Sequence, residues 1–206
     1  MRNERVRVLV EISLTIALAA VLNTMKVFEM PQGGTVSLVM LPLFVLSVRR
    51  GPVVGIVAGA LYGFLDALID PFVVHWAQFL LDYPVGYAAV GLGGLLSARW
   101  RRFEEDRLLN GLMTAALPAV AVGAAARYAA HVASGVVFFS EYAEGQPVLA
   151  YSAAYNLYVP VSAAACFVAL SIVLPALERA VPSGRPDGAA GTVVSGDHGN
   201  LRGASK

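Results

Sequence analysis

Ionisable and amide side chains interrupt an apolar stretch of the chain, HWAQFLLDY. His75, Gln78 and Asp82 stand at positions i, i+3 and i+7 of this stretch, so on an α-helix they share one face. A carboxylate, an amide and an imidazole on one face can hold a ligand by hydrogen bonds, and the carboxylate can balance a positive charge. Such groups are costly inside an apolar segment, so they usually face a cavity or a partner.

A second polar stripe lies in the segment RYAAHVASGVVFF. Arg127, His131, Gly135 and Phe139 recur every four residues, which again places them on one helical face. Gly135 would leave space beside His131. Two explanations need no ligand: Asp82 could pair with Arg127 as a structural ion pair between helices, and His131 could be an ordinary interhelical hydrogen-bonding residue.

Two more segments place polar groups on the same side of the predicted membrane spans. One is the loop FEMPQGGTVS, and the other is YSAAYNLYVP, which supplies Tyr151, Tyr155, Asn156 and Tyr158. Tyr151 and Asn156 differ by roughly 140° on a straight helix, so both can face one pocket only if Tyr151 lies at its mouth or the helix is irregular. We interpret Tyr158 mainly as a residue of the membrane interface, where tyrosines are common.

Together these clusters favour binding over catalysis. Aromatic faces attract a cation and a buried carboxylate balances its charge, so the pattern suits a flat, positively charged ligand. The sequence has no phosphate-binding loop, nucleophile elbow or zinc-protease motif. The single cysteine, Cys166, excludes an internal disulfide and paired-cysteine metal sites. We therefore expect no catalytic residues, no metal and no cofactor.

The composition indicates what positions these residues. The chain is 57% hydrophobic and 14% charged, whereas soluble domains carry about 25% charged residues. Its net charge is +1 with no basic block, which gives no case for nucleic acid. Apolar runs of roughly 20 residues span a bilayer, so we predict an integral membrane protein.

Six spans account for most of the chain. We expect them at about 8–27, 36–48, 52–68, 76–96, within 108–139, and 148–177. The first is read as a retained helix and not as a cleaved signal. Glycines four residues apart at 55, 59 and 63 predict a close-packing face on the third, and the fifth should tilt or break near Pro118. The predicted organisation is an all-α, six-helix membrane domain at 1–181 and a disordered cytoplasmic tail at 182–206.

Basic residues predict the orientation of these spans. Apart from Lys26 and Arg127, every Lys and Arg lies near a terminus or in one of two connecting segments, at 49–50 and 99–107. With six spans all of these fall on one side, which the positive-inside rule makes cytoplasmic together with both termini. The opposite loops carry Glu29, Asp70, Glu141 and Glu144. This acidic mouth would favour a cation, although acidic residues are also simply tolerated in translocated loops.

Three motifs in order carry a resemblance to a known family. PQGGTVSLVMLPLFVLSVRRGPVVGIVAG, QFLLDYPVGYAAVGLGGL and RYAAHVASGVVFFSEYAEGQPVLAYSAAYN resemble the thiamine-specific substrate-binding (S) component of energy-coupling factor (ECF) transporters, and the likeness covers about residues 8–178. The resemblance implies a multi-pass protein of the cell membrane. It also implies a thiamine pocket near the outer surface, formed largely by spans four to six and capped by the loop between spans one and two.

The resemblance also implies which residues bind the ligand. Asp82 takes the place of an acidic residue that is a Glu in some members, and Tyr83 follows it as in the family. A stacking tryptophan is replaced by Phe139, and a capping-loop tryptophan is missing near Met30. The inferred substrate-binding set is Asp82, Tyr83, His131, Phe139, Tyr151, Asn156, Gln78 and Met30.

Partners are implied in the same way. In the family, small residues four apart on the first span contact the transmembrane (T) component, and Ser13 and Ala17 match that pattern; the alternative is ordinary internal packing. The expected function is high-affinity thiamine binding as the S component, with a T component and two ATP-binding subunits in the bilayer. The alternatives are an S component for a thiamine precursor or another vitamin, a stand-alone proton-coupled carrier using Asp82 and His131, and a structural membrane protein.

Overall fold

The computed structural model describes residues 2–100 and 108–181 of the chain. The tail predicted at 182–206, and the basic residues at 101, 102 and 107, lie outside the described residues. The described part is almost entirely helical, with one two-stranded hairpin. The elements in chain order are α1 (Arg2–Thr24), β1 (Phe28–Glu29), β2 (Thr35–Val36), α2 (Met40–Arg50), α3 (Pro52–Ile69), α4 (Trp76–Leu80), η1 (Leu81–Val85), α5 (Gly86–Val90), η2 (Gly91–Leu96), α6 (Ser97–Trp100), α7 (Leu108–Gly111), η4 (Leu112–Ala116), α8 (Leu117–Phe138), η5 (Ser140–Ala143), α9 (Val148–Tyr155) and α10 (Tyr158–Ala180).

Membrane-spanning helices dominate the fold, as the hydropathy predicts. Within the described residues, five helical stretches are long and apolar enough to cross a bilayer: Asn3–Thr24, Pro52–Ile69, Trp76–Trp100, Leu112–Phe138 and Val148–Ala180. The predicted second span differs from expectation. Helix α2 has 11 residues and is therefore only about 16 Å long, roughly half of the hydrocarbon thickness. Part of the apolar run assigned to this span is extended, because Val36 pairs with Phe28 in the hairpin.

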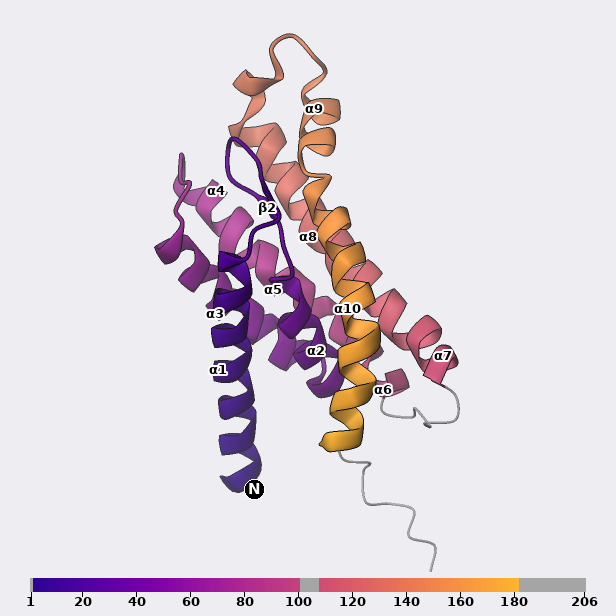
Figure 1. The fold of residues 1–206 in the computed structure, drawn as a ribbon. Coiled ribbons are helices and arrows are strands. Elements are labelled where there is room, and N and C mark those ends of the chain that lie inside the picture. The colour runs from indigo at the N-terminus through magenta and orange to yellow at the C-terminus, as the bar shows by residue number, and fades with distance from the viewer. Residues whose placement is uncertain (1, 101–107, 182–206) are drawn as a thin grey trace, which may run out of the picture.

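The helices form a bundle with two distinct ends. Figure 1 shows the N-terminus of α1 and the last turn of α10 at one end, and the hairpin and α9 at the other. Helix α3 packs against α5 and η2, and α8 packs against α5 and α10. Large apolar side chains such as Leu14, Leu61 and Ile172 remain exposed on the outer faces. An apolar exterior is what a lipid environment requires.

Close packing of α3 against the neighbouring helical stretch depends on two glycines. A Cβ atom at Gly59 would collide with the backbone carbonyl of Tyr87, and one at Gly63 with the carbonyl of Tyr83. The glycine face predicted from the four-residue spacing is thus confirmed. Because it lets the backbones approach, it also fixes the stretch that carries Tyr83 and Tyr87.

Several long helices are locally irregular near proline. The stretch Trp76–Trp100 changes to a π-helix at η1, which contains Pro84. Proline removes a backbone donor and clashes with the preceding turn, so a widened turn is expected there. A second π-helix, η4, directly precedes Leu117 and Pro118, where the sequence predicted a break. The sixth span is divided into α9 and α10 at 156–157.

Ion pairs join three helices at the end of the bundle that holds the start of α1 and the last turn of α10. The Nε atom of Arg50 on α2 lies 2.5 Å from Oε2 of Glu11 on α1. The Nε atom of Arg49 lies 3.0 Å from Oε1 of Glu178 on α10. These contacts bond Arg49 and Arg50 of α2 to carboxylates of α10 and α1.

Candidate ligand-binding site

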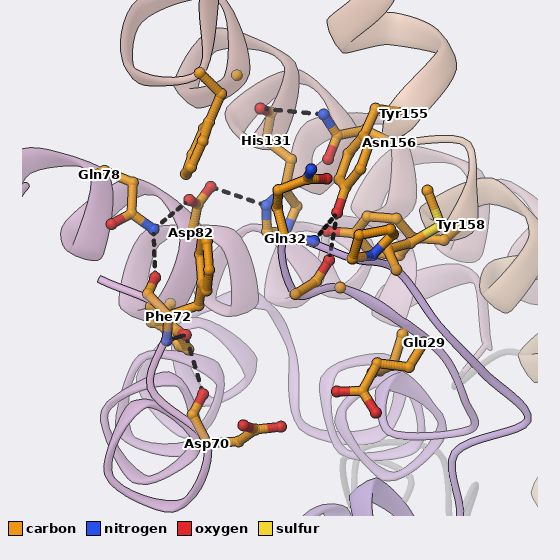
Figure 2. A pocket seen from close by; sticks show the side chains of 18 of the residues that line it. Glu29, Gln32, Asp70, Phe72, Gln78, Asp82, His131, Tyr155, Asn156 and Tyr158 are labelled. Carbon is orange, nitrogen blue, oxygen red and sulfur yellow. Dashed lines mark hydrogen bonds and ion pairs between the residues drawn. The ribbon is translucent and has the colours of Figure 1, made fainter. Parts of the chain in front are cut away.

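A cavity of about 490 Å³ lies at the hairpin end of the bundle. Small-molecule sites typically enclose about 300–1,000 Å³, so its size suits a small organic ligand. It is bounded by the hairpin loop, the end of α3 and the residues that follow it, the α4–α5 stretch, α8, and the α9–α10 junction. Figure 2 shows polar and aromatic side chains from these elements converging on one space.

All eight side chains predicted from the sequence to contact a ligand line this cavity. They are Met30, Gln78, Asp82, Tyr83, His131, Phe139, Tyr151 and Asn156. The two residues predicted to contact a partner protein, Ser13 and Ala17, instead lie exposed on α1. The fold therefore brings the first set together and presents the second set on a separate surface.

Asp82 is a carboxylate of the pocket that is held by three side chains. Its Oδ2 atom accepts hydrogen bonds from Gln78 Nε2 at 2.7 Å and Ser134 Oγ at 2.9 Å. Gln78 is itself fixed, since its amide also bonds Phe72 O and Val74 N. The Asp82 side chain remains 17% exposed. A carboxylate offers about four acceptor positions, so Asp82 retains capacity for a ligand in the cavity.

The bonding of His131 identifies its tautomer. Arg127 Nε lies 3.1 Å from His131 Nε2, and a guanidinium can only donate. Nε2 must therefore accept, so the proton of the neutral ring is on Nδ1. Nδ1 lies 3.0 Å from Asp82 Oδ1 and donates to it. A neutral His131 leaves the negative charge of Asp82 uncompensated by the ring.

The hypothesis of a direct ion pair between Asp82 and Arg127 is wrong. Among the ion pairs of the described residues, none joins these two side chains directly. Arg127 lies one helical turn from His131 on α8 and bonds it, and its Cζ atom sits 3.8 Å from the centroid of the Tyr87 ring. Burial over an aromatic face satisfies the guanidinium, and His131 occupies the position between Arg127 and Asp82.

A second polar cluster in the pocket was missed by the sequence reasoning. Asn23 Nδ2 donates to Asp66 Oδ1 at 2.8 Å, and the Tyr62 hydroxyl donates to the same atom at 3.1 Å. Both Asn23 and Asp66 line the cavity and are buried. The available signal was their type, because an amide or carboxylate within an apolar span usually marks a cavity or a partner.

Aromatic rings form one wall of the cavity. Phe139 stacks on Phe72 with ring centroids 6.0 Å apart, and Tyr151 packs against Tyr155 at 6.1 Å. Phe72 was not predicted, since it lies in the short turn after α3. The turn is held by the Tyr83 hydroxyl, which accepts from Phe72 N at 2.7 Å and donates to Asp70 O at 3.1 Å.

The hairpin loop covers the cavity and is bonded to α9. The Tyr155 hydroxyl accepts a hydrogen bond from Gln32 N and donates one to Gly33 O, each at 2.9 Å. Gly34 has a φ of +88°, and a Cβ there would lie 2.6 Å from the ring of Tyr158. Glycine is therefore required where the loop crosses Tyr158.

The interpretation of Tyr158 as an interface residue is wrong. Its exposed fraction is 9%, and its ring packs beneath the loop, with an edge contact to His131 at 5.9 Å between centroids. Its place in the sequence near the outer end of a span gave no sign of this, because the burial is produced by the docked loop.

The break between α9 and α10 removes the geometric conflict between Tyr151 and Asn156. Helix α9 ends at Tyr155, and Asn156 leaves the helical conformation with ψ of 7°. Asn156 Nδ2 bonds Ser152 O at 2.9 Å, which stabilises the bend. Because the helix is irregular here, both side chains face the same cavity.

The rim of the cavity is acidic but carries one bound lysine. Lys26 Nζ lies 2.5 Å from Asp70 Oδ2 and 2.9 Å from Glu29 Oε1. Hydrogen bonding to Asp70, and then to Glu29, raises the pKa of Lys26 above its ordinary value. Glu29 and Asp70 line the cavity, whereas Glu141 and Glu144 are exposed in the loop after α8. Two carboxylates against one ammonium leave a negative rim, which favours a cation.

Comparison with known proteins places this geometry in a family. The sequence model described as "Thiamine transporter protein (Thia_YuaJ)" matches residues 9–182. The thiamine transporter ThiT of Bacillus subtilis (strain 168) is 37% identical over 180 residues, which cover 85% of this chain and 94% of the relative. ThiT of Lacticaseibacillus paracasei is 32% identical over 122 residues, 57% of this chain and 61% of the relative. A solved structure of ThiT from Listeria monocytogenes superposes with a TM-score of 0.70 at 26% identity, covering 87% of this chain and 97% of that one.

Proposed function

Because the chain belongs to the thiamine transporter protein family, we propose that its cavity binds thiamine as the substrate-specificity component of an ECF importer. The family is one of transporters and not of enzymes. The observation that carries the proposal is a partly exposed carboxylate, Asp82, fixed by three hydrogen bonds in an aromatic-walled cavity.

The chemistry of thiamine matches this arrangement. Its aminopyrimidine ring donates hydrogen bonds, and its thiazolium ring carries a permanent positive charge. Asp82 can accept from the amino group and balance part of the charge. The rings of Phe139 and Tyr151 offer faces for stacking and cation–π attraction. The neutral state of His131 matters here, because an imidazolium beside Asp82 would compete with the ligand for its charge.

Titration calorimetry on the purified protein tests the proposal. Thiamine should bind with one molecule per chain. The thiamine precursor 4-amino-5-hydroxymethyl-2-methylpyrimidine should bind more weakly, since it lacks the cationic ring, and riboflavin should give no binding heat. Absence of thiamine binding by the folded protein would refute the proposed function, and tighter binding of the precursor would identify it as the ligand instead.

Phe139→Trp should tighten thiamine binding by up to about fivefold or leave it unchanged. An indole ring attracts a cation more strongly than a phenyl ring does, and the gain in binding free energy should be at most about 1 kcal/mol. Phe139 already lines the cavity beside Phe72. The matched control is Phe138→Trp, since Phe138 stacks on His75 outside the cavity. Calorimetric titration of both variants provides the comparison. Tenfold weaker binding by Phe139→Trp alone would show that the position does not stack on the ligand.

The proposed arrangement in the bilayer has six crossings with both termini cytoplasmic. The five long helical stretches supply five crossings, and the short α2 together with the hairpin would supply the remaining one. Extended backbone at membrane depth is tolerated where it is bonded and lines a cavity, as the hairpin loop does here. The N-terminal end of α1 and the last turn of α10 lie at the same end of the bundle, which supports an even number of crossings (Figure 1).

Labelling of introduced cysteines tests this topology. Arg99→Cys and Gln146→Cys alter exposed positions at opposite ends of the bundle. A membrane-impermeant thiol reagent should label Gln146→Cys in intact cells and Arg99→Cys only after permeabilisation. The unmodified protein is the control and should stay unlabelled, because Cys166 is fully buried. Labelling of Arg99→Cys in intact cells would reverse the proposed orientation.

Coupling to a T component and two ATP-binding subunits is the second part of the proposal. Ser13 and Ala17 are exposed, one turn apart, on the outer face of α1. Their exposure favours a partner surface over the alternative of internal packing, since small residues four apart permit close approach of another helix.

A further inference from the structure

One buried polar atom in the cavity has no partner. Among the side chains that the structure describes, Gln32 Oε1 is the buried nitrogen or oxygen atom without a hydrogen bond. The other buried polar groups of the cavity are paired, as shown above for Asp66, Gln78 and Asn156. Leaving a buried acceptor unpaired is unfavourable, and such atoms in native proteins usually have a specific reason.

Hydrogen bonds fix the backbone around Gln32. Gln32 N donates to the Tyr155 hydroxyl. The loop closes on itself through Gly33 N to Met30 O at 3.1 Å and Met30 N to Gly34 O at 2.9 Å. The loop therefore carries Gln32 into the cavity, and Figure 2 shows it among the lining side chains, with His131 between it and Asp82 in that view.

A ligand with a hydrogen-bond donor would provide the partner that Gln32 Oε1 lacks. Thiamine offers two kinds of donor, the amino group of the pyrimidine ring and the hydroxyl of the hydroxyethyl arm on the thiazolium ring. The proposed function, on which this inference rests, assigns the amino group to Asp82 on the α4–α5 stretch. Gln32 comes from the covering loop and not from the α4–α5 stretch, so it would meet a different part of the ligand, the flexible and hydrophilic arm.

We propose that Gln32 is a specificity residue whose side-chain oxygen accepts a hydrogen bond from the free hydroxyl of the bound thiamine. The ligand then supplies the partner that the protein lacks. The contact distinguishes thiamine from analogues without a hydroxyl at this position. Discrimination by a hydroxyl is effective when the site presents a buried group that would otherwise remain unpaired.

Binding of two ligands to matched variants tests the inference. The ligands are thiamine and its analogue with an ethyl arm in place of hydroxyethyl. The wild-type protein should prefer thiamine by roughly three- to tenfold, the range for one neutral hydrogen bond. Gln32→Met keeps the approximate length of the side chain but removes the acceptor, so it should bind both ligands equally. Gln146→Met, in an exposed outer loop, should retain the preference.

The possible failures are distinguishable. If wild type binds thiamine and Gln32→Met keeps the preference for the hydroxyl, the inference is wrong and the proposed function stands. Equal weakening of both ligands by Gln32→Met would also overturn it, because the contact would then involve another part of the ligand. If wild type binds neither ligand, the proposed function itself fails.

Discussion

Asp82→Asn should weaken thiamine binding by roughly ten- to a hundredfold. A hydrogen bond to a charged group contributes about 1.5–3 kcal/mol, and about 1.4 kcal/mol corresponds to a factor of ten in affinity. The substitution keeps the size of the side chain but removes its charge and one acceptor oxygen. The new NH2 group is a donor, and it would face another donor, because Gln78, Ser134 and His131 all donate to Asp82. Calorimetric titration of thiamine measures the loss.

The control for this prediction is Asp70→Asn at the rim. Asp70 also lines the cavity, but its side chain is 54% exposed and paired with Lys26, so its removal should change affinity by less than about threefold. Thermal unfolding without ligand shows whether Asp82→Asn damages the fold. Equal affinity of wild type and Asp82→Asn for thiamine would remove Asp82 from the site.

Ala17→Trp should abolish assembly with the T component and thiamine uptake, while binding of thiamine to the isolated subunit persists. The small, exposed side chain of Ala17 allows another helix to approach closely, and an indole at this position would hold the two helices apart. The cavity is at the hairpin end and does not include Ala17. Co-purification of the subunits and uptake by cells expressing all of them measure the effect.

The matched control is Ile172→Trp, which adds the same ring to an exposed position of α10 and should assemble normally. If Ala17→Trp still assembles and transports, α1 does not provide the docking surface. Uptake by this chain in cells that lack the ATP-binding subunits would contradict the importer proposal and favour the stand-alone carrier.

Residues that line the cavity could be predicted because they differ from the apolar composition of their segments. Asp82 and His131 are ionisable groups in apolar spans, a combination that is costly without a function or a partner. What the spacing could not decide was the partner of each group. A pairing of Arg127 with Asp82 was one alternative, but Arg127 lies one turn from His131 on the same helix, and this local bond is the one that forms.

The helices were predicted better than the segments that deviate from them. Hydropathy located the five long stretches, because length and composition suffice for that. The run at 36–48 is apolar apart from two serines, so its composition does not distinguish a full span from a short helix preceded by a strand. The hairpin that shortens it depends on the pairing of Val36 with Phe28 and on docking to Tyr155. The burial of Tyr158 and the position of Gln32 at the cavity follow from the same docking.

Mass spectrometry of the ligand that co-purifies with the protein tests the central claim most directly. The protein would be expressed in cells supplied with thiamine, purified in detergent without added vitamin, and denatured to release what it holds. The account predicts thiamine at close to one molecule per chain in the wild type and much less in Asp82→Asn. Release of a different compound by folded wild-type protein, or of none, would contradict it.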